Sequence, residues 1–291
     1  MINLYETVRQ HPEYFKQLQC KGLLFTQYDC PQQSVIQDLF SEHNYIAYVI
    51  SGKRTFHLPG ETYLMTAGKC VFAKKGAWVA EKEPGVGWCV LVFFIPDSYL
   101  RQFVKESREN LSMVVRTALA NRQMLELDVN PVTEGFFNSM IPYFDQVPKA
   151  PESLLELKFK ELLFNLLINP QNNSFLQWVY TLADDSRDPL QRTMEANYAF
   201  NLSLDDYASI AGRSLASFKR EFKAVYATSP GKWLIQRRLD HASLLLQTSS
   251  KNISEITFDS GFENSTHFSR LFKLKFGHTP TEFRKRSVAL Q

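Results

Sequence analysis

Short runs rich in β-branched and aromatic residues lie between Gly22 and Ile95, and pairs such as Pro59-Gly60 and Pro84-Gly85 separate them. Short strands at this spacing are typical of a small barrel or sandwich. Ser51-Gly52-Lys53 is among the turns that the pattern predicts. The expected strands are Leu23–Tyr28, Tyr45–Ile50, Arg54–Leu58, Thr62–Met65, Cys70–Ala73, Trp78–Glu81 and Trp88–Ile95.

The pattern becomes helical after Pro96. Within residues 151–168 the apolar surface is wider than one stripe, which fits either complete burial or a self-association surface. Residues 184–188 are polar and are interpreted as an interdomain linker, with Pro189 at the first position of the next helix. The expected helices are Asp97–Val104, Met113–Leu119, Pro151–Ile168 and Ser174–Leu182.

The last hundred residues contain an internal repeat, which appears when this segment is aligned with itself at a shift of 49 to 50 residues. Aromatic residues also match aromatic ones, since Tyr226 aligns with Phe276 and Trp233 with Phe283. Two copies of one structural unit follow. The identical pairs are Phe218 and Phe268, Arg220 and Arg270, Phe222 and Phe272, Lys223 and Lys273, and Pro230 and Pro280.

Each copy is predicted to form two short helices around a tight turn. An N-cap residue type with a carboxylate three positions later predicts the start of the first helix. A glycine ends that helix, and a second N-cap type starts the next one. The paired positions are Ser203 and Asn252, Asp206 and Glu255, Gly212 and Gly261, and Ser214 and Asn264.

The second helix of each copy has an apolar stripe, Phe218-Phe222-Val225 in the first and Phe268-Leu271-Phe272 in the second. Helix, glycine turn and helix form the helix-turn-helix arrangement, whose second helix enters the major groove. The remaining face is polar and basic, and Arg220 and Arg270 are its strongest candidates for recognition. The residues expected to face DNA are Ala216, Ser217, Lys219, Arg220 and Lys223, then Thr266, His267, Ser269, Arg270 and Lys273.

A continuous helix is predicted from Lys232 to Leu246, because the segment has no Pro or Gly and its apolar positions 235, 239, 242 and 246 form one stripe. Such a helix is a rigid spacer between the two copies. Successive major-groove faces lie about 34 Å apart, so both copies are expected to bind one side of DNA, one helical turn apart.

Residues 189–286 resemble the DNA-binding domain of the AraC/XylS family of bacterial transcription regulators. The resemblance implies sequence-specific binding near promoters, usually for activation, with RNA polymerase as a partner. The amino-terminal half resembles, more loosely, the subgroup that activates type III secretion genes, from Tyr45 to Phe94 and around residues 157–163. Partner proteins control that subgroup. The matching motifs are Arg238-Leu239, Ala242, Leu245-Leu246, Ile253, Glu255-Ile256, Gly261-Phe262, Phe268-Ser269-Arg270, Phe272-Lys273, Phe276-Gly277, Thr279-Pro280 and Phe283-Arg284.

Residues 63–72 resemble the turn of cupin-like barrels, and a barrel of this size can enclose one small ligand. Enzymatic cupins bind a metal through clustered His and Glu. Here Asn44 follows His43, and His57 lies on another strand. Neither a metal site nor a cofactor is therefore expected. The candidate pocket residues, for which a plain core is the simpler interpretation, are Tyr45, Phe56, Tyr63, Trp78 and Trp88.

Composition agrees with a folded protein, since 44% of the residues are hydrophobic. The longest apolar run, Trp88–Ile95, is far shorter than the roughly 20 residues of a membrane span. No secretory signal is visible, so a cytoplasmic protein is expected. Net charge differs between the parts: residues 1–190 carry −3 and residues 191–291 carry +6. The four cysteines, Cys20, Cys30, Cys70 and Cys89, show no C-x-x-C spacing and are expected to be reduced.

The sequence therefore predicts an α+β multidomain protein. Its parts are a cupin-like β-barrel (1–95), a helical connector (96–183), a linker (184–188) and an all-α domain with two helix-turn-helix motifs (189–291). The favoured function is a transcription regulator that binds double-stranded DNA, forms a homodimer and responds to a small molecule or a protein. The alternatives are a cupin-like metal-dependent enzyme with an appended helical domain, and an interaction protein whose basic domain is a remnant.

Overall fold

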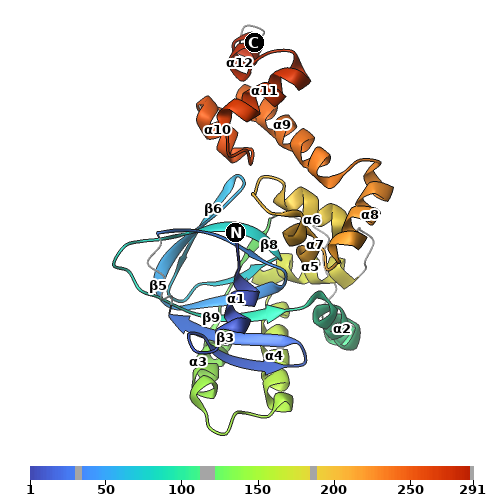
Figure 1. Ribbon diagram of the computed structural model, residues 1–291. Coiled ribbons are helices and arrows are strands. Elements are labelled where there is room, and N and C mark those ends of the chain that lie inside the picture. The colour runs from blue at the N-terminus through green and yellow to red at the C-terminus, as the bar shows by residue number, and fades with distance from the viewer. Residues whose placement is uncertain (30–34, 112–121, 184–188, 289–291) are drawn as a thin grey trace. The chain divides into compact units, whose positions relative to one another are not determined.

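The computed structural model describes residues 1–29, 35–111, 122–183 and 189–288. The chain divides into two compact units, Met1–Asp188 and Pro189–Gln291 (Figure 1). The expected linker 184–188 and the expected helix Met113–Leu119 lie outside the described residues. No helix within those residues is long and apolar enough to cross a membrane.

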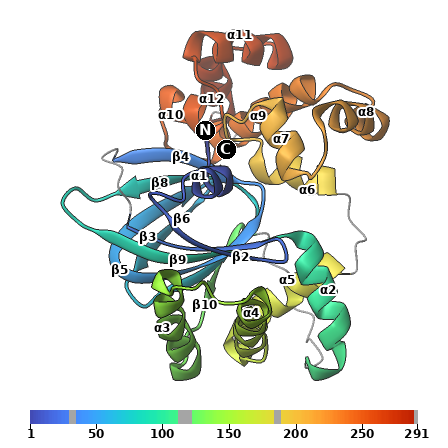
Figure 2. The same ribbon diagram turned by 60° about the horizontal axis from the view of Figure 1, so that its bottom comes forward.

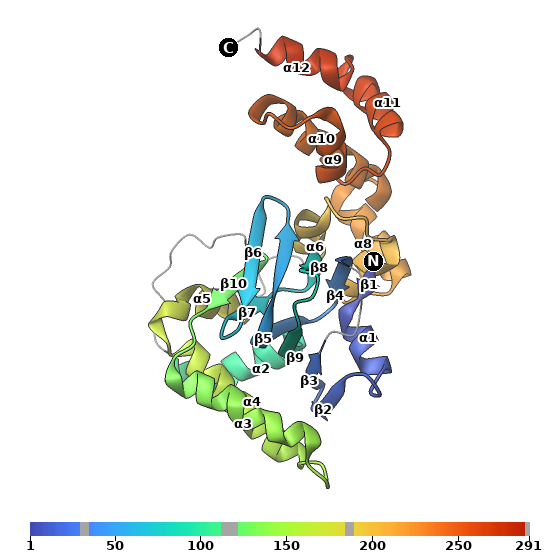
Figure 3. The ribbon, with the colours of Figure 1, turned by 90° about the vertical axis from the view of Figure 1, so that its left-hand side faces the viewer.

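A curled sheet forms the centre of the first unit (Figure 3). Its longest strand, β5, pairs with β7 and β9 in its first half and with β6 and β8 in its second half. The order along the main path is β1-β4-β8-β5-β9-β3-β2. The strands are β1 Ile2–Asn3, β2 Lys16–Cys20, β3 Leu23–Asp29, β4 Ile36–Ser41, β5 Asn44–Leu58, β6 Glu61–Thr66, β7 Cys70–Ala73, β8 Gly76–Lys82, β9 Trp88–Ile95 and β10 Met124–Leu127.

The turn predicted at residues 51–53 was wrong, because β5 runs through it with a bulge between Val49 and Ser51. Gly52 permits this path: its φ is +88°, and a Cβ there would lie 1.8 Å from the Gly87 carbonyl oxygen. The sequence pattern also missed β2, β4 and β10. β10 pairs with β7, so the sheet takes a strand from beyond residue 95.

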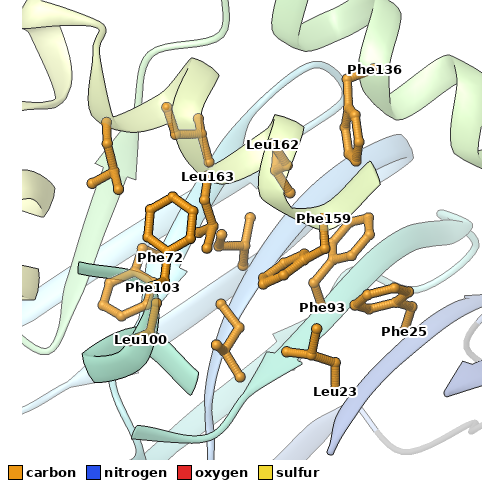
Figure 4. Close-up of a cluster of buried hydrophobic side chains, with 14 of the residues drawn as sticks. Leu23, Phe25, Phe72, Phe93, Leu100, Phe103, Phe136, Phe159, Leu162 and Leu163 are labelled. Carbon is orange, nitrogen blue, oxygen red and sulfur yellow. The ribbon is translucent and has the colours of Figure 1, made fainter. Parts of the chain in front are cut away.

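The helices from residue 97 onward cover one face of the sheet, which is the outer face of the curl (Figure 2), whereas Tyr5 of the first helix contacts Phe94 on the other face. The core between them contains Phe25 and Phe93 from the strands, and Phe159 and Leu163 from α4 (Figure 4). Most of the apolar surface of α4 is therefore buried within its own unit, although Leu157 is exposed. The helices of this unit are α1 Leu4–Gln10, α2 Asp97–Ser107, α3 Pro131–Asp145, α4 Glu152–Leu167 and α5 Asn173–Ala183, with short 3₁₀ turns at Arg108–Asn110 and Pro170–Asn172.

The described cysteines, Cys20, Cys70 and Cys89, are buried and form no disulfide with one another, and Cys30 lies outside the described residues. Burial raises the pKa of the Cys20 thiol to about 12. A thiol with so high a pKa is a poor nucleophile, because the reactive form is the thiolate. These cysteines are core residues, as expected.

The second unit is helical. Its longest helix, α9, runs between the two predicted helix-turn-helix copies (Figure 1). Leu239, Ala242 and Leu246 of α9 are buried, as the spacer prediction requires, while Ile235 is partly buried. The helices are α6 Pro189–Asn197, α7 Leu204–Ile210, α8 Leu215–Tyr226, α9 Pro230–Thr248, α10 Ile253–Asp259, α11 Ser265–Phe276 and α12 Pro280–Val288.

Candidate nucleic-acid interface

Local hydrogen bonds fix the start of the first helix in each copy. In the first, the Asp206 amide donates to Ser203 Oγ at 3.1 Å, and the Ser203 amide donates to Asp206 Oδ2 at 2.9 Å. In the second, Asn252 and Glu255 make the same reciprocal pair at 2.9 and 2.7 Å. Each pair satisfies two amides that a helix start leaves free. The predicted helix starts are confirmed.

Glycines end both first helices in the left-handed region. Gly212 has φ +69° and Gly261 has φ +86°. The second helix then begins at an N-cap side chain, where Ser214 accepts from the Ser217 amide and Asn264 accepts from the His267 amide. The sequence therefore specifies the tight turn that sets α8 against α7 and α11 against α10.

The buried stripes differ from the prediction at one position. Phe218 and Phe222 of α8 are fully buried, but Val225 is 57% exposed. Tyr226 occupies the position in the stripe that was assigned to Val225. The centroid of its ring lies 4.5 Å from that of Phe222, on which it stacks, and 5.7 Å from that of Trp233. The stripe thus continues at spacing four instead of three. In the second copy Phe268 and Phe272 are buried and Leu271 is half-buried.

The residues predicted to face DNA lie on the opposite side of the two helices. We call these two surfaces the α8 face and the α11 face. On the α8 face Ala216, Lys219, Arg220 and Lys223 are exposed and Ser217 is half-buried; on the α11 face Thr266, His267, Arg270 and Lys273 are exposed and Ser269 is half-buried.

An acidic residue, Glu221, which the sequence analysis did not single out, lies among the basic side chains of the α8 face. Arg213 Nε donates to Glu221 Oε2 at 3.0 Å, and Ser217 Oγ donates to Glu221 Oε1 at 3.1 Å. The hydrogen bond from Arg213 holds the pKa of the Glu221 carboxyl below its usual range. Arg220 in turn donates to Ser217 Oγ at 3.0 Å, so the network orients this arginine.

The second copy has no such network, since Leu271 stands at the position of Glu221. α11 has one more basic residue, Lys275, which is bound to α9. Its ammonium group forms a 2.6 Å ion pair with Asp240 and donates a 3.1 Å hydrogen bond to the Gln236 carbonyl oxygen. Arg270 and Lys273 are thus the exposed cations of α11. The two faces share one arginine position and one lysine position, but Ser269 stands where the α8 face has Lys219, and the neighbouring residues differ.

Contacts near Arg238 join the two copies. Its guanidinium donates to the Tyr198 carbonyl oxygen at 2.6 Å and to the Phe200 carbonyl oxygen at 2.8 Å. The same loop reaches the turn of the second copy, where Asn201 donates to the Glu263 carboxylate. A Cβ at Gly261 would lie 2.8 Å from the Ala199 carbonyl oxygen. We call this three-way contact between residues 198–201, Arg238 and the Gly261 turn the junction.

The candidate pocket residues of the first unit lie on one face of the sheet. Paired residues of antiparallel strands share a face, and alternate residues return to it. Tyr45 pairs with Phe94, Gly52 with Trp88, and Phe56 with both Tyr63 and Ala80. We call this surface, which lies opposite helices α2 to α5, the inner face. Its members, including those predicted to line a pocket, are Tyr45, Gly52, Arg54, Phe56, Tyr63, Trp78, Ala80 and Trp88.

These aromatic residues form two contacts. The ring centroids of Tyr45 and Trp78 are 5.4 Å apart, and those of Phe56 and Trp88 are 6.1 Å apart. Arg54, which sequence analysis missed, is buried next to Trp88. The sequence does contain a signal for its burial. Arg54 alternates with Gly52 and Phe56 along β5, and alternate residues of a strand lie on the same face, so Arg54 is directed to the same apolar face as Phe56.

The histidines considered as metal ligands lie apart. His57 Nε2 is 2.7 Å from the Glu81 carboxylate, whereas the His43 ring contacts Tyr5 at 4.2 Å. No group of three His, Cys, Asp or Glu side chains suited to a metal occurs in the described ranges.

Comparison with known proteins matches both units. The chain matches the ExsA N-terminal regulatory domain over residues 44–178 and a helix-turn-helix domain over residues 207–286. It is 27% identical to the thermoregulatory protein LcrF of Yersinia pestis over 245 residues, 83% of this chain and 89% of LcrF. It is also 27% identical to the HTH-type transcriptional regulator ExsA of Pseudomonas aeruginosa, covering 81% of this chain and 84% of ExsA.

A solved AraC-type DNA-binding domain regulator from Chromobacterium violaceum is 37% identical. That match covers 34% of this chain and 88% of the other, with a TM-score of 0.32.

Proposed function

This chain belongs to the AraC/XylS family of transcription regulators, and from that premise we propose that α8 and α11 are its recognition helices, inserted into adjacent major-groove segments. It is a sequence-specific DNA-binding regulator and not an enzyme. The proposal assigns the reading of DNA to the α8 face and the α11 face.

The observation that supports this assignment is the repeated geometry of the two copies. Both have the same caps, the same glycine turn and exposed cations at matching positions, Arg220 and Lys223 beside Arg270 and Lys273. A solvated basic face alone is common, but two equivalent faces are a specific arrangement. The spacer α9 has 19 residues, about 28 Å at 1.5 Å per residue, close to the roughly 34 Å between successive major-groove faces.

Arg220 and Arg270 are assigned to base edges or phosphates, since a guanidinium forms bidentate bonds to guanine. Lys219, Lys223 and Lys273 are assigned to the phosphate backbone, which contributes affinity without sequence information. Ala216, Ser217, Thr266, His267 and Ser269 complete the proposed contact set.

Replacing Arg270 by Ala tests the assignment. Specific binding to the protein's own upstream region should weaken by about 1–3 kcal/mol, because one bidentate contact is lost. The measurement is a mobility-shift titration with scrambled competitor, across a salt series. Arg9→Ala is the matched control, since it removes an exposed arginine from the first unit. Equal affinities of Arg270→Ala and wild type would remove Arg270 from the interface.

The first unit is proposed to control the second. Its match to an N-terminal regulatory domain supports effector control by a small molecule or a partner protein. A further relative, 26% identical over 245 residues, is the virulence regulon transcriptional activator VirF of Yersinia enterocolitica. We therefore propose activation through RNA polymerase, in the cytoplasm where the promoter lies. Exposed apolar residues such as Leu157 of α4 offer a surface for a homodimer. Light scattering with and without promoter DNA tests that last point.

A further inference from the structure

A buried arginine with no acceptor lies on the inner face. Arg54 of β5 is 3% exposed, yet its Nε and Nη2 atoms have no hydrogen-bond partner in the described part of the chain. Leaving a charged donor buried and unpaired costs several kcal/mol. The ring of Trp88 lies beside it, with its centroid 5.2 Å from the guanidinium carbon.

Two further donors of the inner face are buried without a partner in the described part of the chain. The indole Nε1 atoms of Trp88 and Trp78 are buried without a partner among the described residues. Both indoles belong to the inner face with Arg54. Arg54 and the neighbouring Trp88 thus present a positive charge and an N–H donor, neither with an acceptor among the described residues, and this pair is complementary to an anion.

The carboxylates of the neighbouring strands are engaged elsewhere. Glu81 pairs with His57, and Glu61, which lies on the inner face opposite Leu58, accepts a hydrogen bond from the Tyr63 hydroxyl and lies 3.6 Å from Arg122. Thr55 is opposite Glu81 in the sheet, which places Glu81 on the face opposite to Arg54. Across the sheet Arg54 is paired with Met65 and Lys82, and within the described residues no carboxylate pairs with it.

We propose that Arg54 is the anion-binding residue of a ligand site on the inner face, and that its ligand is a small molecule with a carboxylate and an apolar body. Nε and Nη2 form one edge of the guanidinium, the edge that binds both oxygens of a carboxylate side by side. The apolar body is recognised by Trp88, Phe56 and Met65, which is paired with Arg54 across β5 and β6. The ligand's role as an effector rests on the proposed function, but its binding does not.

The test uses full-length protein and a panel of acetate, hexanoate, decanoate, 3-phenylpropanoate and indole-3-acetate, with decan-1-ol and inorganic phosphate for comparison. Midpoints of thermal unfolding and tryptophan fluorescence are recorded against concentration. A larger carboxylate should raise the midpoint in a saturable way, because a ligand that binds only the folded state stabilises it. Acetate, phosphate and decan-1-ol should have little effect.

Arg54→Met should weaken that carboxylate at least about 30-fold, as expected when one partner of a buried charged pair is lost. Without ligand, Arg54→Met should be at least as stable as wild type, because the unpaired charge is gone. Lys53→Met is the matched control, since it removes the adjacent, half-exposed cation and should leave binding unchanged.

Three results would overturn the proposal. They are a panel without any Arg54-dependent response, an equal response to decan-1-ol, and a ligand-free Arg54→Met protein that is clearly less stable than wild type. Mobility shifts on the same preparations separate this outcome from the proposed function. Wild-type protein that binds a carboxylate but not the promoter would refute DNA recognition and leave the ligand site in place. Wild-type protein that binds the promoter but no carboxylate would refute only the ligand site.

Discussion

Two glycines at equivalent turns have different surroundings, although both have positive φ. A Cβ at Gly212 would meet nothing within 4 Å, whereas a Cβ at Gly261 would lie 2.8 Å from the Ala199 carbonyl oxygen. The first position therefore requires glycine for its backbone conformation alone. The second requires it also for the close approach of two chain segments, and a backbone oxygen has little freedom to move away.

Gly212→Ala and Gly261→Ala form a matched pair of substitutions. Each should lose about 1–2 kcal/mol of stability from the left-handed conformation, and Gly261→Ala should lose more because of the clash. Urea unfolding followed by hydrogen exchange in peptides from α7–α8 and α10–α11 measures both losses. Equal losses would show that the loop at residue 199 yields to the added methyl group.

At the scale of single residues, sequence reasoning was reliable where the interaction is local. The capping pairs Ser203–Asp206 and Asn252–Glu255 connect residues three apart, so the sequence shows both partners. Glu221 was missed because its partner Arg213 lies eight residues away, across the turn. Arg54 was missed because its burial depends on strands that are distant in the sequence.

At the scale of elements, the junction holds the two helix-turn-helix copies together. Arg238 of α9 donates to the loop between α6 and α7, and that loop contacts the turn before α11. Because α9 connects α8 to α11, the junction restricts how the two recognition helices are placed relative to each other.

Arg238→Gln should therefore weaken binding to a two-site operator and make it less sensitive to spacing. Inserting one or two base pairs between the half-sites should reduce wild-type affinity by at least about tenfold, since 10 to 10.5 base pairs separate equivalent groove positions. The variant should lose less than wild type for the same insertion. Competition mobility shifts with the altered operators measure this difference.

Arg237→Gln is the matched control for Arg238→Gln. It removes the same charge from the adjacent position, whose partners are Glu195 and the Tyr198 ring. It should keep the wild-type dependence on spacing. The same dependence in Arg238→Gln would show that α9 alone sets the distance between the helices.

The limits of strands were predicted correctly where turn residues bound an apolar segment. They were predicted wrongly where pairing with a neighbouring strand determines the conformation. Trp88–Ile95 and Cys70–Ala73 are strands with the predicted limits. The glycine in Ser51-Gly52-Lys53 indicated a turn, but pairing with β9 holds the segment within β5. β2 and β4 have polar residues within short runs, so their strand character comes from their neighbours in the sheet.

At the scale of the whole molecule, positive charge is concentrated in the DNA-binding unit. Residues 191–291 carry a net charge of +6, against −3 for residues 1–190. An acidic first unit and a basic second unit favour contact of DNA with the second unit only.

Replacing Lys219, Lys223 or Lys273 by Gln should lower the slope of log Kd against log salt by about 1 for each lysine, because each phosphate contact releases about one counterion. Preference for the specific sequence over competitor should stay close to wild type. Lys105→Gln, in α2 of the first unit, should leave the slope unchanged. If the slope does not change in any of the three variants, the phosphate backbone contacts a surface other than these lysines of the α8 and α11 faces.

The two recognition helices differ although their scaffolds are copies. The α8 face presents Ala216 and an arginine oriented by Ser217, with Glu221 nearby, whereas the α11 face presents Thr266 and His267 beside Arg270. The proposed assignment of both faces to DNA therefore predicts that one chain reads two different half-sites in a fixed order. Under that assignment the operator is asymmetric, so inverting it reverses the order in which the α8 face and the α11 face follow one another along the promoter.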